Sequence, residues 1–135
     1  MDYYYTDIYV DDDEPIKIGL GSAFDLAITS GSNQLNILVD NIGVLDGSFS
    51  EIIGEKLTNK FVKEKEIYEK GVLIRLLLGS NKYSNIKGIV FGLEVKLETL
   101  SRFIENNNID AVVYCPLHDY EYSKYEQMYT HAVKL

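Results

Sequence analysis

The chain has 135 residues, of which 46% are hydrophobic and 25% are charged, a composition typical of one globular domain rather than of disordered or fibrous proteins. Its 13 basic and 21 acidic residues give a net charge of −8 without any basic cluster, so direct binding to nucleic acid is not expected. No apolar run approaches the roughly 20 residues that cross a bilayer. Cys115 has no disulfide partner, and the opening residues do not resemble a secretory leader. We therefore expect a single cytoplasmic domain over residues 1–135, with no membrane contact.

The N-terminal segment, residues 1–14, is acidic and rich in tyrosine. Alternation of residue types over 3–10 predicts a strand, and the acidic run that leads to Pro15 predicts a turn. The run lacks the spacing of a calcium-binding loop, so a solvated turn is favoured over a metal site. The segment contains no base and supplies most of the net negative charge, through Asp2, Asp7, Asp11, Asp12, Asp13 and Glu14.

The next part of the chain is predicted to form β structure. Residues 16–20 alternate as a short strand would. Residues 24–29 and 35–39 also alternate, and the turn residues 30–33 between them predict a hairpin. The glycines of the segment 19–22 lack the remaining residues of a phosphate-binding loop, so we interpret them as a bulge or a turn.

After residue 47 the hydrophobic period changes to that of a helix. Ser48 and Glu51 have capping-box spacing, and the apolar stripe that follows predicts a helix over 49–66. The apolar run 72–78 then predicts a strand, which is followed by a polar loop through Asn85.

The C-terminal part alternates helices with strands. Residues 93–99 fit either structure, and we favour a strand to about Leu97, followed by a helix to Asn106. The continuous apolar run 109–115 predicts a central strand buried on both faces, and Asp119 is positioned to cap a last helix. Together these elements predict the α+β class, with a mixed β-sheet of about five to seven strands and two or three helices packed on it.

Cys115, His118 and Asp119 place a thiol, an imidazole and a carboxylate just beyond the predicted central strand, where open sheets often hold their ligands. A nucleophile with its base is therefore a catalytic alternative. A zinc site would need further ligands that the chain does not offer in a recognisable spacing. Because a cysteine at the end of an apolar strand is usually a small core residue, we assign no catalytic residue, metal or cofactor.

The interleaving of tyrosine with acidic residues predicts a surface that binds a basic partner, because tyrosine supplies contact area and opposite potentials favour association. We expect a non-enzymatic protein-binding module, similar to an inhibitor or an immunity protein, that occludes a basic site on another protein. Two alternatives stay open: a small enzyme or nucleotide-binding domain with a pocket near Cys115, or a structural subunit of a homo-oligomer. The predicted partner-binding residues are Tyr3, Tyr4, Tyr5, Asp7, Tyr9, Asp11, Asp12, Asp13, Tyr122, Tyr125 and Tyr129.

Overall fold

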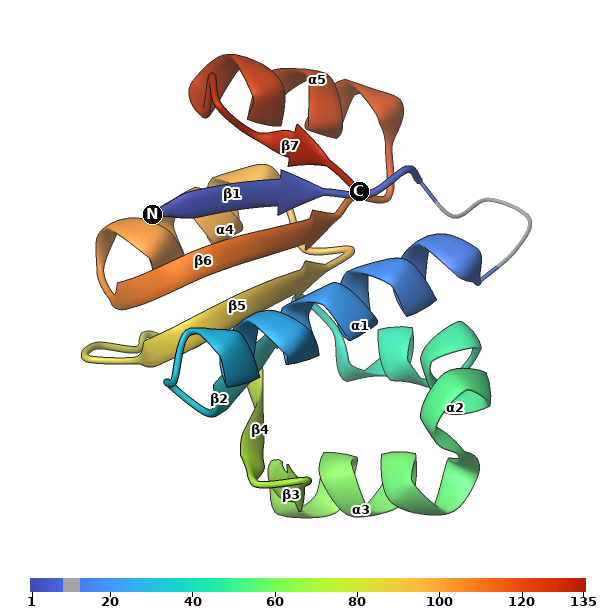
Figure 1. Cartoon of the computed structure of the whole chain (residues 1–135). Helices are drawn as coiled ribbons and strands as arrows, with labels where there is room; N and C mark the ends of the chain where they lie inside the picture. The colour runs from blue at the N-terminus through green and yellow to red at the C-terminus, as the bar shows by residue number, and fades with distance from the viewer. Residues whose placement is uncertain (9–12) are drawn as a thin grey trace.

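A computed structural model describes residues 1–8 and 13–135 and contains a seven-stranded sheet in the order β3-β4-β2-β5-β6-β1-β7 (Figure 1). The strand β3 runs antiparallel to β4, and the other described pairings are parallel. The sheet is thus mixed, as the sequence predicts, and its strands are β1 (Asp2–Tyr5), β2 (Gln34–Val39), β3 (Glu66–Glu69), β4 (Val72–Leu78), β5 (Lys87–Leu93), β6 (Asn108–Cys115) and β7 (Val133–Lys134).

Helices cover both faces of the sheet. One face carries α1 (Glu14–Thr29), α2 (Ser48–Ile53) and α3 (Glu55–Glu64), together with the short 3-10 helix η1 (Ile42–Leu45), whereas the other carries α4 (Leu97–Glu105) and α5 (Asp119–Met128). Figure 1 shows α1 in front of the sheet and α4 behind it. The described α-helices therefore exceed the two or three expected, and none of them is long and apolar enough to cross a membrane.

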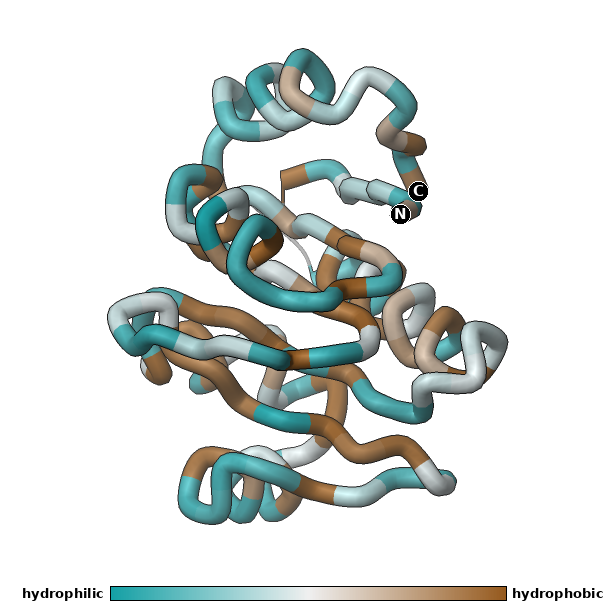
Figure 2. Tube along the Cα trace, turned by 90° about the vertical axis from the view of Figure 1, so that its left-hand side faces the viewer, coloured by the Kyte–Doolittle hydropathy of each residue, from teal (hydrophilic) through white to brown (hydrophobic). Residues whose placement is uncertain are grey.

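The core consists of two apolar layers, one on each side of the sheet. Side chains of β5 and β6 alternate between these layers: Phe91 and Val113 face α1, whereas Val90 and Val112 face α4. Each of these residues is fully buried, which confirms that residues 109–115 form a strand covered on both faces. In Figure 2 the hydrophobic segments run through the middle of the molecule and the hydrophilic ones along its outer turns and helices.

Several sequence-based elements are confirmed. The strand over 72–78 is β4, and the last helix is α5. The predicted cap of α5 is wrong by one residue, because His118 occupies the N-cap position and Asp119 is the first helical residue. In the ambiguous region the strand β5 ends at Leu93 and the helix α4 begins at Leu97, so the favoured order of strand followed by helix is correct.

The predicted strand at 16–20 is wrong, and so is the hairpin, because residues 16–20 and 24–29 belong to α1. The second strand of that hairpin, 35–39, is confirmed as part of β2. The buried face of α1 is formed by Ile16, Gly19, Ala23 and Ala27, which recur at helical spacing but are mostly small. A Cβ atom at Gly19 would lie only 2.8 Å from the ring of Phe91, so small residues let the helix approach β5 closely. The segment 19–22 is accordingly neither a bulge nor a turn.

The predicted helix over 49–66 is interrupted at Gly54, which separates α2 from α3 with a φ of +94°. Side chains rarely tolerate this backbone conformation, so glycine allows the chain to change direction there. The capping box is also wrong: Ser48 is the first helical residue, and Gly47 occupies the N-cap position. The apolar stripe nonetheless packs as expected, because Phe49 and Phe61 are buried and stack with ring centroids 6.1 Å apart.

The predicted strand over 3–10 is only partly represented, because β1 ends at Tyr5. Residues 9–12 lie outside the described part of the chain. The expected turn up to Pro15 is corrected at its C-terminal end, since α1 already begins at Glu14 and has Pro15 in its first turn.

Candidate functional site

Most of the tyrosines predicted to bind a partner pack against one another between β1 and α5. Tyr125 is fully buried, and its ring contacts those of Tyr3, Tyr5 and Tyr129 at centroid distances of 6.4, 6.0 and 5.0 Å. Tyr5 is also buried and stacks on Tyr122, with centroids 6.0 Å apart. We call these five residues the β1–α5 tyrosine cluster.

This cluster belongs largely to the core. Tyr3 stacks on Tyr129 at a centroid distance of 4.1 Å, and both are half-buried at the margin of the cluster, as is Tyr122. Tyr4 is half-buried against the opposite layer of the core. Tyr5 and Tyr125 therefore offer no side-chain surface to a partner and could only support the more exposed rings around them.

Three acidic residues of the N-terminal segment, Asp7, Asp13 and Glu14, lie near the carboxyl end of β1. Asp7 is exposed, and its Oδ1 atom lies 2.7 Å from Nζ of Lys134, so the carboxylate raises the pKa of that lysine. Asp13 lies 3.9 Å from Nζ of Lys17, one helical turn away. Tyr9, Asp11 and Asp12, which were predicted to share this surface, are outside the described residues.

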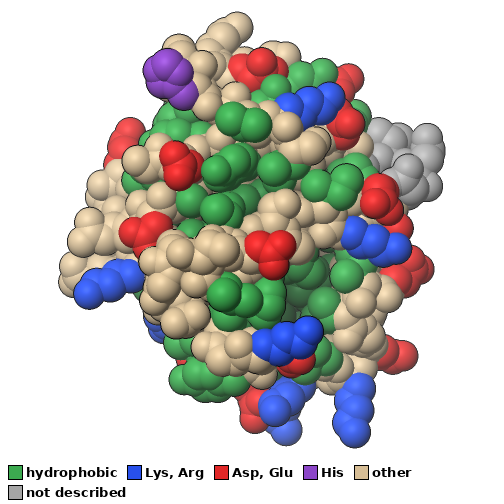
Figure 3. Space-filling view, in the orientation of Figure 1, with side chains coloured by type: hydrophobic (Ala, Val, Ile, Leu, Met, Phe, Trp, Pro, Cys, Tyr) green, Lys and Arg blue, Asp and Glu red, His purple; other side chains and the backbone are tan. Residues whose placement is uncertain are grey.

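Parallel pairing brings further carboxylates to the same place. Because β1, β2, β5 and β6 are parallel, the residues that follow them meet at one edge of the sheet. This edge is on the right of Figure 1, and Figure 3 shows acidic side chains along the same margin. We call it the acidic edge, and it comprises Asp7, Asp13, Glu14, Asp40, Asp46, Glu94, Glu98 and Asp119.

The carboxylates of the acidic edge differ in their surroundings. Asp40 accepts a hydrogen bond of 2.9 Å from the backbone N–H of Lys96, just before α4. Glu94 has a left-handed φ of +54°, and its N–H donates to the carbonyl of Cys115 over 3.0 Å. Burial raises the pKa of Glu94 to about 7, whereas Asp119 is exposed in the first turn of α5, where the helix dipole favours a negative charge.

Apolar side chains are exposed among these acids. Ile18 is 40% exposed, Leu117 43% and Tyr120 61%. The ring of Tyr120 stacks on His118 with centroids 5.4 Å apart, and Nζ of Lys124 lies 5.9 Å from its centroid. Beside the end of β1, a hollow of about 280 Å³ is lined in part by Pro15 and Ile18.

Sequence reasoning missed the full extent of this edge. Asp40, Glu94 and Tyr120 are far apart in the chain, and only the parallel order of the strands brings them to one side. One signal was present for Tyr120, because it falls outside the helical stripe of Tyr122, Tyr125 and Tyr129 and should therefore point away from the core.

Cys115, His118 and Asp119 are adjacent in the chain but differ in their environments. Cys115 is fully buried, and burial raises the pKa of its thiol to about 12 although the Thr6 hydroxyl acts in the opposite direction. His118 and Asp119 are both exposed. A thiol with such a pKa is protonated at neutral pH, so this arrangement gives no support to a nucleophilic role for Cys115.

The described residues contain no group of three or more His, Cys, Asp or Glu side chains placed to hold a metal ion. Comparison with known proteins gives no match to a family model, a curated protein or a solved structure.

Proposed function

We propose that the protein is a non-enzymatic binding module, acting as an inhibitor or in the manner of an immunity protein, that covers a basic site on a partner protein with its acidic edge. One observation supports this proposal above the others: carboxylates from distant segments converge at one edge of the sheet beside exposed apolar side chains. Helix termini and ion pairs account for some of these carboxylates, such as Asp119 and Asp7. Nearby like charges still repel one another, and the exposed apolar side chains remain in solvent in the free chain.

The two kinds of side chain have separate roles in such an interface. Carboxylates at the edge would attract a basic surface from a distance and so raise the rate of association. Tyr120 is the best placed anchor, since aromatic residues that become buried on binding commonly contribute a large share of the binding energy. Lys17 and Lys134 pair with Asp13 and Asp7, and Lys96 and Lys124 lie beside Tyr120. These four cations neutralise only part of the edge, because it holds eight carboxyl groups.

The test compares two triple variants that change net charge equally. The edge variant carries Asp7→Asn, Asp13→Asn and Asp46→Asn, and the control variant carries Asp2→Asn, Asp25→Asn and Asp110→Asn, away from the acidic edge. The partner is captured from the native cell with the wild-type chain, purified, and measured by surface-based kinetics at several salt concentrations. We expect the edge variant to associate about tenfold more slowly at low salt, with a flatter salt dependence.

Tyr120→Ala should act differently from the charge variants. Loss of an aromatic anchor should accelerate dissociation by about tenfold or more and change association little. The proposal would be overturned by a captured partner that binds the edge variant and Tyr120→Ala with wild-type kinetics. It would also be overturned if both charge variants slowed association equally, since net charge alone would then explain the effect.

A further inference from the structure

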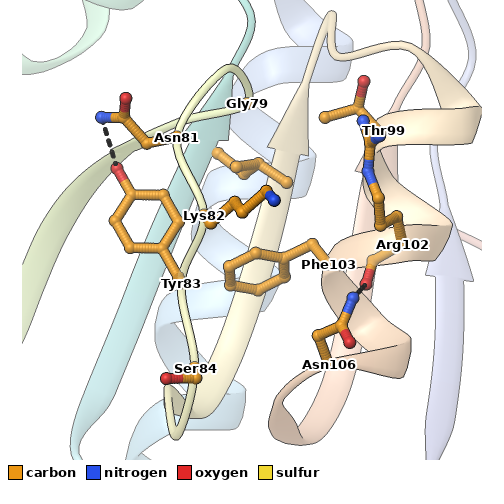
Figure 4. Close-up of a pocket in the computed structure, with 10 residues that line it drawn as sticks. Gly79, Asn81, Lys82, Tyr83, Ser84, Thr99, Arg102, Phe103 and Asn106 are labelled. Carbon is orange, nitrogen blue, oxygen red and sulfur yellow. Dashed lines mark hydrogen bonds between the residues drawn. The ribbon is translucent and has the colours of Figure 1, made fainter.

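The connection between β4 and β5, residues 79–86, leaves a hollow on the face of the sheet that carries α4. Parallel strands are usually joined by a helix that covers the sheet between them. Here an irregular segment crosses the sheet instead, and a cavity of about 480 Å³ remains between it and α4 (Figure 4). This volume falls within the range of small-molecule sites, which is about 300–1,000 Å³.

Hydrogen bonds hold the connection against the sheet and α4. The backbone N–H of Leu78 donates to the Tyr83 hydroxyl over 3.0 Å, and the N–H of Ile86 donates to Oδ1 of Asn107 over 2.9 Å. The side-chain amide of Asn107 also donates to the carbonyls of Phe103 and Tyr83. These bonds position the backbone of the connection and the Tyr83 ring before any ligand binds, which lowers the entropic cost of binding. Lys82 and Arg102 are exposed side chains at the opening of the cavity.

The charge of the cavity is opposite to that of the whole chain. Its lining contains Lys82 and Arg102 and no acidic residue, although the net charge of the protein is −8. Neither cation forms an ion pair with the part of the chain that the structure describes. In Figure 4, Lys82 reaches from the connection toward α4, while Arg102 extends along α4 toward Thr99. At the rim, Asp40 approaches Gly79 through its Oδ1 atom, while its Oδ2 atom accepts the Lys96 N–H. The two cations of the lining therefore outnumber this one neighbouring carboxylate.

The rest of the lining combines aromatic and amide groups. Tyr83 and Phe103 meet edge to face, with ring centroids 6.2 Å apart and an interplanar angle of 70°. Asn81 and Asn106 add side-chain amides, whose nitrogens donate to the Tyr83 hydroxyl and the Arg102 carbonyl (Figure 4). Their oxygens and remaining N–H groups can bond the edge of a heterocycle.

We propose that this cavity binds a small aromatic molecule that carries a phosphate group, with a nucleoside monophosphate as the model compound. Two cations match the charge of about −1.5 to −2 on a phosphate monoester at neutral pH, and the guanidinium of Arg102 can engage two of its oxygens. The aromatic wall and the amides face the remainder of the molecule. This site adjoins the acidic edge only at Asp40 and does not depend on the proposed partner.

The test is a calorimetric titration of the full chain with AMP, GMP, CMP and UMP, with adenosine and inorganic phosphate as separate probes. We expect at least one nucleotide to bind at least tenfold more tightly than both adenosine and inorganic phosphate, because both halves of the molecule contribute. Binding should shift the amide resonances of Gly79, Ser84 and Thr99. Lys82→Gln and Arg102→Gln should each weaken binding by about tenfold, as expected for loss of a charge-assisted contact.

Lys56→Gln is the matched control, because Lys56 is an exposed lysine on α3, on the other face of the sheet. It should bind the nucleotide as the wild type does. The proposal would be overturned if no nucleotide bound at millimolar concentration, if adenosine or phosphate bound as tightly, or if Lys56→Gln weakened binding as much as Arg102→Gln.

Discussion

At the scale of single residues, two buried phenols show how unevenly the core satisfies its polar groups. The hydroxyl of Tyr114 lies 2.8 Å from the carbonyl of Val95 and 3.0 Å from Oε2 of Glu121. The hydroxyl of Tyr125 is equally buried and comes near the Tyr4 backbone, but it makes no hydrogen bond within the described chain. Burial raises the pKa of both phenols, so both stay neutral at physiological pH. Ring packing in the β1–α5 tyrosine cluster must offset the cost of the second hydroxyl.

Tyr125→Phe should therefore raise the free energy of unfolding by about 1 kcal/mol, because it removes an unsatisfied buried hydroxyl and keeps the ring. Tyr114→Phe is the matched control and should lower the same quantity by about 1 kcal/mol or more, since it leaves Glu121 without one of its partners. Urea denaturation of the three proteins measures both changes. Equal losses in the two variants would contradict the prediction and show that the Tyr125 hydroxyl has a partner in solution.

At the scale of elements, the pairing of β2 with β5 depends on a glycine at the start of β5. Gly88 has a φ of +95°, and a Cβ atom there would overlap the carbonyl oxygen of Gln34 in β2. The backbones approach so closely at this point that no side chain fits, and the register irregularity between β5 and β6 occurs at the same residue.

Gly88→Ala should lower the free energy of unfolding by about 2 kcal/mol or more, because both the backbone conformation and the space are unfavourable. Gly21→Ala is the control: Gly21 is exposed in the middle of α1, with no atom within 4 Å of its added Cβ. It should raise stability by about 0.5–1 kcal/mol through helix propensity. Thermal or urea denaturation separates the two signs, and a mild effect at Gly88 would argue against the observed pairing.

The elements that could be predicted are those that bury large apolar side chains. The run 109–115 is apolar throughout because β6 is covered on both faces, and its sequence indicates that directly. The helix α1 was mistaken for β structure because its buried contacts use Gly19, Ala23 and Ala27, while Ile18 and Ile28 remain exposed. Hydrophobic periodicity follows large side chains, so a helix that packs through small residues is easily misassigned.

At the scale of the whole molecule, strand order determines where charge accumulates. Sequence reasoning grouped the acids of residues 1–14, because they lie close together in the chain, but it did not place Asp40, Glu94 or Asp119 on the same edge as Asp7 and Asp13. That grouping depends on which strands are parallel, which local patterns do not encode. The same limit applies to the cavity beside α4, since its shape depends on how residues 79–86 cross the sheet.

The half-buried carboxyl group of Glu94 at the acidic edge makes the stability of the whole molecule depend on pH. Burial raises the pKa of Glu94 from its ordinary value near 4.5 to about 7. Between these values the folded chain holds a proton that the unfolded chain has released, so the contribution of this group to stability falls as the pH rises through that window. Below the window both states hold the proton, and the group has no effect on stability.

Glu94→Gln should therefore have a higher free energy of unfolding than the wild type at about pH 8. The gain should be about 1 kcal/mol, because the group is partly exposed to solvent. Near pH 4 the two proteins should be equally stable. Glu98→Gln is the control, because Glu98 is exposed in the first turn of α4, where its charge favours the helix. That variant should be slightly less stable at neutral pH. Urea denaturation across this pH range measures the difference for each variant. A constant gain in Glu94→Gln at every pH would attribute the effect to packing or backbone conformation and would contradict the shifted pKa.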